Sequence, residues 1–174
     1  MAFTGLLHDG NISLRALEMS DLDTLYRWEN DPSVWLVSGT TVPFSRELLS
    51  QYIQSADLDI FIVRQLRLII EQDGRPAGAV DLFDFDPLNC RAGVGILIDP
   101  AYRRNGCAYT ALRLMERYAR TRLRLHQLYC NITADNLPSL QLFGKAGYQV
   151  TGTKKDWIAT PDGWTDEHLL QLVL

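Results

Sequence analysis

The segment from residue 91 to residue 123 constrains the fold of this chain more than any other. It opens with a nearly continuous apolar run, Arg91–Asp99 (RAGVGILID), which is typical of a central strand covered on both faces. A short loop follows, and Asn105–Leu123 then repeats small and apolar residues at helical spacing. A buried strand that turns tightly into a long amphipathic helix predicts a layered α/β domain.

The elements on either side of this unit follow a simple order. Before it we expect a strand, two helices and a hairpin, namely Asn11–Leu17, Ser20–Asn30, Arg46–Gln54, Arg67–Gln72 and Ala77–Asp86, with Asp31-Pro32 ending the first helix. After it we expect a helix capped by Asn136 and three strands, namely Gln127–Ile132, Tyr148–Lys154 and Glu167–Leu174. The order predicts an α/β (α+β) fold in one domain over residues 1–174. Its central sheet is mixed and mostly antiparallel, with six to seven strands and helices on both faces.

The composition excludes several classes of protein. The 174 residues are 47% hydrophobic and 22% charged, which is typical of a globular chain rather than a disordered one. A net charge of −4 argues against nucleic-acid binding, because that binding rests on neutralising phosphates. The cysteines lie far apart, the histidines lack ligand spacing, the N-terminal residues lack a signal-peptide pattern, and no apolar run reaches the ~18 residues of a membrane span. We therefore expect a cytoplasmic protein with no metal, no nucleic-acid partner and no membrane contact.

The loop between the buried strand and the long helix predicts a diphosphate site. The first turn of a helix has unpaired N–H groups and a partial positive charge, which together favour an anion. Gly106 lets the backbone approach a ligand closely, and Ala108 is small enough for the ligand to lie against the turn. Arg103 and Arg104 add charge-assisted hydrogen bonds. No G-x-G-x-x-G pattern and no Lys-Ser/Thr after the glycine are present, which argues against a dinucleotide fold and a P-loop.

At these residues the sequence resembles the GNAT superfamily of N-acetyltransferases. Arg103-Arg104-Asn105-Gly106-Cys107-Ala108 matches the family signature [Q/R]-x-x-G-x-[G/A]. About thirty residues later, Asn136-Leu137-Pro138-Ser139 and Phe143-Gly144-Lys145-Ala146-Gly147-Tyr148 are similar to its second motif. The resemblance spans the whole chain and is closest to the branch of spermidine (diamine) N-acetyltransferases and ribosomal-protein N-terminal acetyltransferases.

The resemblance implies acetyl-CoA as the cofactor. It places the cofactor at Ile96, Leu97, Ile98, Arg103, Arg104, Asn105, Gly106, Cys107, Ala108, Asn136, Ser139, Phe143 and Lys145. It also implies that a backbone N–H near Leu97 polarises the acetyl carbonyl. Many relatives carry a tyrosine general acid where this chain has Phe143, so that role cannot be transferred. Tyr129, Cys130 or Tyr148 are substitutes, although each also fits a strand core. Asn136 is a candidate for holding the cofactor or a water, and it fits an N-cap equally well.

Four acidic residues are candidates for binding the acceptor, namely Glu29, Asp81, Asp84 and Asp86. Polyamine-acetylating relatives carry acids in the strand corresponding to VDLFDFDP, and Asp84 is our candidate base. Strand alternation puts Asp84 and Asp86 on one face and Asp81 on the other. The competing interpretation is an ordinary solvated hairpin.

The expected function is transfer of an acetyl group from acetyl-CoA to a primary amine, a small-molecule diamine or polyamine being favoured. Two alternatives stay open. One is an N-terminal acetyltransferase acting on a protein, and the other is a non-catalytic acyl-CoA-binding or sensing module. Relatives often dimerise through their terminal strands, so a homodimer is also a candidate assembly.

Overall fold

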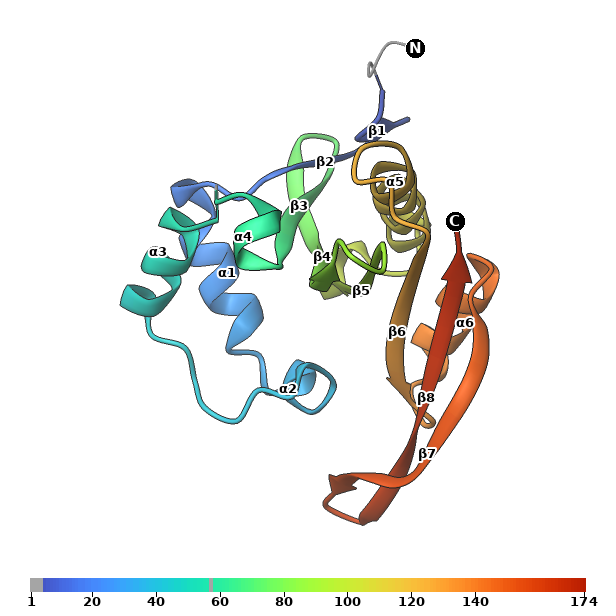
Figure 1. The fold of residues 1–174 in the computed structure, drawn as a ribbon. Helices are drawn as coiled ribbons and strands as arrows, with labels where there is room; N and C mark the ends of the chain where they lie inside the picture. The colour runs from blue at the N-terminus through green and yellow to red at the C-terminus, as the bar shows by residue number, and fades with distance from the viewer. Residues whose placement is uncertain (1–4, 57) are drawn as a thin grey trace.

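A single eight-stranded sheet organises the chain in a computed structural model, which describes residues 5–56 and 58–174 (Figure 1). The strand order is β1-β2-β3-β4-β5-β6-β8-β7. The strands are β1 (His8–Asp9), β2 (Ile12–Ala16), β3 (Leu66–Gln72), β4 (Arg75–Asp86), β5 (Arg91–Ile98), β6 (Gln127–Thr133), β7 (Gln149–Thr160) and β8 (Gly163–Val173). All pairs are antiparallel except β5 with β6. The predicted class is confirmed, and the short β1 accounts for one strand more than expected.

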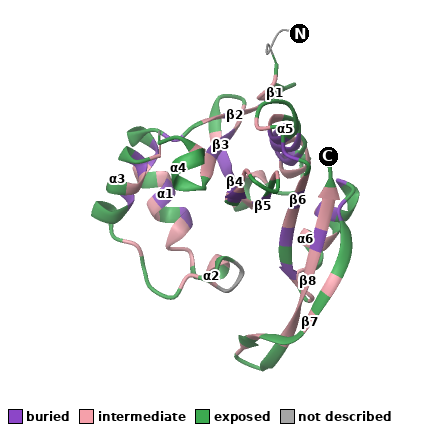
Figure 2. Ribbon diagram, in the orientation of Figure 1, coloured by how far each residue is buried: buried purple, intermediate pink, exposed green. Residues whose placement is uncertain are grey.

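Helices lie on both faces of the sheet (Figure 2). On one face, α5 (Cys107–Thr121) and α6 (Leu137–Lys145) bury the larger apolar core, which includes Leu82, Val94, Met115 and Leu128. On the other face, α1 (Leu22–Glu29) and α3 (Arg46–Gln54) cover a smaller apolar cluster. The short helices are α2 (Pro32–Ser38) and α4 (Ile60–Val63), with 3₁₀ turns at Met19–Asp21 and Pro100–Tyr102. None of these described helices is long and apolar enough to cross a membrane.

The helices α2 and α4 were not predicted, and the reason is local. Asp31-Pro32 ends one helix and also starts the next, since the Asp31 side chain accepts the Ser33 N–H and Pro32 occupies the first helical position. A proline is a helix breaker inside a helix but is well suited to its first turn. The α3 helix agrees with its predicted bounds, and the Ser45 side chain caps it by accepting the Leu48 N–H.

The parallel pair of β5 and β6 is short, and this positions the site. The two strands pair only over Arg91–Gly93 and Gln127–Tyr129. Beyond that point β5 continues to pair with β4, and β6 continues to pair with β8. The sheet therefore opens between residues 94–98 of β5 and residues 130–133 of β6. We call this opening the fork.

Candidate active site

The β5 edge of the fork carries backbone groups that point into the opening. The Asp99 N–H donates to the Ala77 carbonyl of β4, and the β4–β5 register is regular from Ile98 back to Gly93. Backbone groups alternate in direction along a strand, so the N–H of Leu97 points toward β4. The N–H and C=O groups of Ile96 and Ile98 point toward β6. An extended ligand in the fork meets the backbone of these two residues rather than that of Leu97.

The predicted diphosphate loop joins the end of β5 to the start of α5. Arg103, Arg104, Asn105 and Gly106 are exposed, and Gly106 has a left-handed φ of 88°. A side-chain carbon at Gly106 would have no neighbour within 4 Å, so the space in front of the helix is open. The Asn105 side chain accepts the Cys107 N–H at 3.1 Å. The following N–H groups of the first turn have no intrahelical acceptor, and they suit an anion.

Three further hydrogen bonds hold this loop in place. The Arg103 Nε donates to the Ile98 carbonyl at 3.0 Å. The Asp99 carboxylate accepts the Ala101 N–H and, at 2.8 Å, the Trp28 indole N–H of α1. Burial alone would raise the pKa of Asp99, but these hydrogen bonds hold it below its usual value. Trp28 is buried, and its hydrogen bond to Asp99 ties α1 to the loop.

The C-terminal end of the second motif lies next to the start of α5. Asn136 caps α6, because its side chain accepts the Ser139 N–H at 3.2 Å. Lys145 lies at the other end of α6, with its Nζ 4.5 Å from the centre of the Tyr109 ring of α5. The structure therefore brings Lys145 close to the predicted diphosphate loop. Cys107 is buried and Ala108 is half-buried, so both contribute to the packing of this turn.

Phe143 is buried and packs edge-to-face on Tyr148, with ring centres 5.0 Å apart. The position therefore has no hydroxyl to offer a leaving thiolate. Cys130 and Tyr148 are also buried, and burial raises the pKa of Cys130 to about 12. Both substitutes behave as core residues, which leaves the half-buried Tyr129 as the alternative.

Arg67 engages two of the four acidic candidates, a pairing that the sequence did not reveal. Its guanidinium donates to both Asp81 oxygens, at 2.6 and 2.9 Å, and also to Glu29 of α1. The three side chains are only 15–22% exposed. Asp81 raises the pKa of Arg67 despite its burial, so the guanidinium stays charged. The predicted role of Glu29 and Asp81 in binding the acceptor stays a prediction, and here they form a structural ion-pair network.

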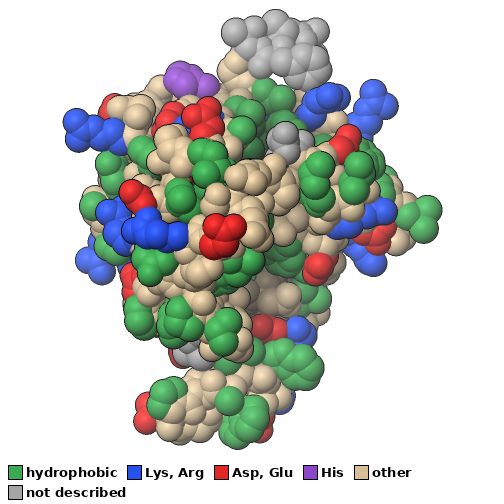
Figure 3. All heavy atoms as spheres, turned by 90° about the vertical axis from the view of Figure 1, so that its left-hand side faces the viewer, with side chains coloured by type: hydrophobic (Ala, Val, Ile, Leu, Met, Phe, Trp, Pro, Cys, Tyr) green, Lys and Arg blue, Asp and Glu red, His purple; other side chains and the backbone are tan. Residues whose placement is uncertain are grey.

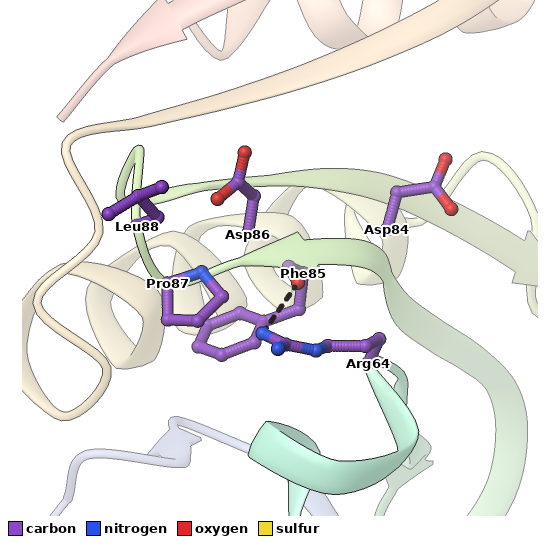
Figure 4. A pocket seen from close by; sticks show the side chains of 6 residues that line it. All are labelled: Arg64, Asp84, Phe85, Asp86, Pro87 and Leu88. Atoms are coloured by element: carbon purple, nitrogen blue, oxygen red, sulfur yellow. Dashed lines mark hydrogen bonds between the residues drawn. The ribbon is translucent and has the colours of Figure 1, made fainter.

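The other two acids lie beside a shallow pocket of about 350 Å³ at the β4–β5 turn (Figure 4). Its lining residues are Arg64, Asp84, Phe85, Asp86, Pro87 and Leu88. Asp86 pairs with Arg91 at 3.2 Å and accepts two hydrogen bonds from Asn89, which keep its pKa low. Asp84 instead accepts a hydrogen bond from the Tyr129 hydroxyl at 3.3 Å. Their carboxylates point away from Arg64.

The alternation used to separate Asp81 from Asp84 and Asp86 does not hold. The β4–β5 register shifts between Phe83 and Asp86, where β4 carries one extra residue. Leu82 and Phe85 both enter the larger core although they are three residues apart. A β-bulge has this effect, and no local pattern in the sequence predicted the bulge.

The charge on the α3 side of the molecule is mixed, with Lys, Arg, Asp and Glu side chains interspersed (Figure 3).

Within residues 5–56 and 58–174, no group of three His, Cys, Asp or Glu side chains is placed to hold a metal ion.

Comparison with known proteins gives this geometry a family. Residues 11–149 match the model of the acetyltransferase (GNAT) domain. The spermidine N(1)-acetyltransferase of Escherichia coli (strain K12) is 29% identical over 145 residues, which are 82% of this chain and 75% of that protein. A spermidine N(1)-acetyltransferase of Vibrio cholerae is 25% identical over 154 residues, or 83% of this chain and 82% of that protein. A crystal structure of spermidine N-acetyltransferase from Vibrio cholerae in complex with CoA and spermine superposes with a TM-score of 0.86 and 20% identity. It covers 95% of this chain and 96% of its own, and it supports the fold.

The chain thus belongs to the GNAT acetyltransferase family, since the family model covers most of it. It is an acyl-CoA-dependent N-acetyltransferase with acetyl-CoA as its cofactor. The residues present fit this cofactor. The open first turn of α5 suits a diphosphate, and the free β5 edge of the fork suits the amides of a pantetheine arm.

Proposed function

We propose that this protein acetylates a diamine or polyamine. The observation that carries the proposal is the position of the fork, which lies between a site suited to acetyl-CoA and the acidic end of β4. The relatives named spermidine N(1)-acetyltransferase support the same substrate class. A polyamine is cationic at neutral pH, and carboxylates are the groups that recognise it.

In the proposed reaction, the neutral amine nitrogen attacks the thioester carbonyl of acetyl-CoA. The new N–C bond forms, the C–S bond breaks, and the proton lost by the amine ends on the departing thiol. The free N–H of Ile96 or Ile98 is better placed than that of Leu97 to polarise the carbonyl. A thiol has a pKa of ~8.5, so the thiolate is a fair leaving group and is protonated by water without a tyrosine at position 143.

The proposed cofactor residues are those that border the fork and the α5 turn, with Lys145 reaching the turn from α6. Arg103 and Arg104 supply positive charge for the diphosphate. Asn136 caps α6 and is proposed to contact the cofactor as well.

A panel of amines with acetyl-CoA tests the proposal. Thiol release is measured with spermidine, putrescine, a monoamine and a set of peptides with free N-termini. Turnover of the polyamines at the highest kcat/KM supports the proposal, and turnover of the peptides alone overturns it in favour of an N-terminal acetyltransferase. Thermal stabilisation by acetyl-CoA without thiol release on any amine would indicate a binding module.

We also propose that the chain self-associates. A structure of spermidine N-acetyltransferase from Vibrio cholerae is described as dodecameric. In this chain β7 is the outer strand of the sheet, and Val150 and Trp157 on it are more than half exposed. Light scattering of the purified protein distinguishes a monomer from a dimer or a larger assembly.

A further inference from the structure

Asp84 lies on strained backbone at the β-bulge of β4. Its φ is 48°, in the left-handed region that residues other than glycine rarely adopt. The bulge places Asp84 and Phe85 opposite the single residue Ala92 of β5. Bulges and strained residues of this kind concentrate next to functional sites.

The bulge changes which side chain enters the core. Val80 and Leu82 both point into the core beneath α5, so regular alternation would send the next carboxylate, Asp84, there too. Instead Phe85 enters that core and packs edge-to-face on Phe61, with ring centres 5.0 Å apart. Asp84 is turned out into solvent.

The exposed carboxylate is held at the closed end of the fork. Tyr129, whose hydroxyl donates to Asp84, pairs with Gly93 in the last residue pair before the strands separate. The Phe83 ring covers Gly93 so closely that a side-chain carbon on Gly93 would lie 2.2 Å from the ring. The same Phe83 ring packs edge-to-face on Tyr129. Two aromatic rings thus flank the point at which the opening begins.

Asp84 differs from the other acidic candidates in its partners. Glu29 and Asp81 are paired with Arg67, and Asp86 is paired with Arg91. Among the described residues, no Lys, Arg or His lies within ion-pair distance of Asp84. Its charge is therefore available to a cationic ligand.

We propose that Asp84 binds the ammonium group of the acceptor that is not attacked, and that Tyr129 is the positioning residue that directs its carboxylate toward the fork. The proposal rests on the proposed acetylation of a polyamine. An ion pair stabilises the charged form of an amine, so a nitrogen paired with Asp84 is a poor nucleophile and a good anchor. Anchoring one end of a diamine holds the other end near the thioester. Asp84 thereby selects diamines and polyamines over monoamines.

The test compares putrescine and spermidine with butylamine. For the Asp84→Asn variant we expect kcat/KM with both polyamines to fall about 10- to 100-fold, mainly through KM, because the variant loses a charge-assisted contact. For butylamine, kcat/KM should stay within about twofold. Asparagine tolerates the left-handed backbone, so the fold is kept. If Asp84 were the catalytic base, kcat would fall for butylamine as well, and that result would overturn the proposal.

Tyr129→Phe removes only the hydroxyl. We expect a rise of about three- to tenfold in the KM for putrescine, with kcat nearly unchanged. A fall in kcat for every amine would instead make Tyr129 the general acid and would contradict a positioning role. Tyr118→Phe on α5 is the matched tyrosine control.

Asp73→Asn is the matched acidic control, because Asp73 also has a positive φ of 52° but lies in the β3–β4 turn. It should leave the ratio of putrescine to butylamine activity unchanged. If the wild-type protein acetylates peptides and no polyamine, the proposed function fails. If it acetylates polyamines and Asp84→Asn keeps the wild-type selectivity, only the role of Asp84 fails.

Discussion

The two faces of the sheet are filled by different chemistry. Beneath α5 and α6 the core is close-packed and apolar, with Glu116 as a buried carboxylate inside it. Beneath α1 and α3 a smaller apolar cluster lies beside Arg67 and its two acidic partners. The first face packs α5 and α6 against the sheet. The second borders the proposed acceptor site, and its two partly buried acids need a balancing cation.

The largest expected effect comes from removing that cation. Arg67→Met leaves Glu29 and Asp81 close together with no positive partner, and we expect the free energy of unfolding to fall by about 3–5 kcal/mol. Urea denaturation measures the change. Replacing all three side chains with apolar residues should recover most of the loss. A cost below about 1 kcal/mol for Arg67→Met would mean that the network is not structural and that its acids are free for the acceptor.

The buried carboxylate of the opposite face gives the next effect. Burial raises the pKa of Glu116 to about 7 although Arg113 opposes the shift. The Glu116 carboxyl has a higher pKa in the folded state than its unfolded value of about 4.5. Its stabilising contribution is therefore complete at pH values below 4.5. The stabilisation is lost as the pH rises through 7. Glu116→Gln should therefore match wild type at pH 4 and exceed it by about 2–3 kcal/mol above pH 8. Equal stability of the two proteins across this range would show that Glu116 is not strained by burial.

Substitution of Gly78 tests how tightly the sheet is packed on the face covered by α5. A side-chain carbon at Gly78 would lie 2.2 Å from the Leu97 carbonyl oxygen, so Gly78→Ala must displace β5 at the fork. We expect a loss of about 2 kcal/mol in unfolding free energy, with weaker acetyl-CoA binding by calorimetry. Gly144→Ala in α6 is the control, because that site is open and a helical alanine should add about 0.5–1 kcal/mol. A harmless Gly78→Ala would indicate a loosely packed β4–β5 pair.

The smallest expected effects come from the two helix-capping residues Ser45 and Asn136. They distinguish a role in capping from a role in acetyl-CoA binding. Ser45 caps α3 and Asn136 caps α6 by equivalent hydrogen bonds. Each alanine substitution should cost about 1 kcal/mol of stability. Asn136→Ala should in addition weaken acetyl-CoA binding severalfold, whereas Ser45→Ala should not. Unchanged affinity in both variants would restrict Asn136 to its role as a cap.

The sequence predicted the helices around the α5 turn well, because their signals are local. Gly106 and the helical spacing after it act within a few residues, and α5 appears where they place it. Asn136 likewise indicates the start of a helix, because Pro138 follows two residues later in the first turn. Apolar alternation located the seven main strands, but β7 continues beyond the predicted Lys154 to Thr160, and β8 begins at Gly163 rather than at Glu167.

The acceptor side depends on contacts between distant residues, and the sequence was less informative there. Arg67 meets Glu29 across 38 positions, which no spacing rule reveals. The prediction of which sheet face each acid points to relied on strand alternation, and the bulge at Asp84 breaks that alternation. In the structure, the bulge is identified by the positive φ of Asp84, an acidic residue on left-handed backbone.

The short pairing of β5 with β6 has a consequence for hydrogen exchange. The Ile98 side chain is buried and the Ile96 side chain is half-buried, yet their amides point into the fork, away from the ladder with β4. These amides should exchange rapidly in the free protein, as frayed ends do, although they lie in the middle of the sheet. A cofactor that lies along β5 would slow them selectively. Amide by amide, the exchange rates would then record how far the ligand extends into the fork.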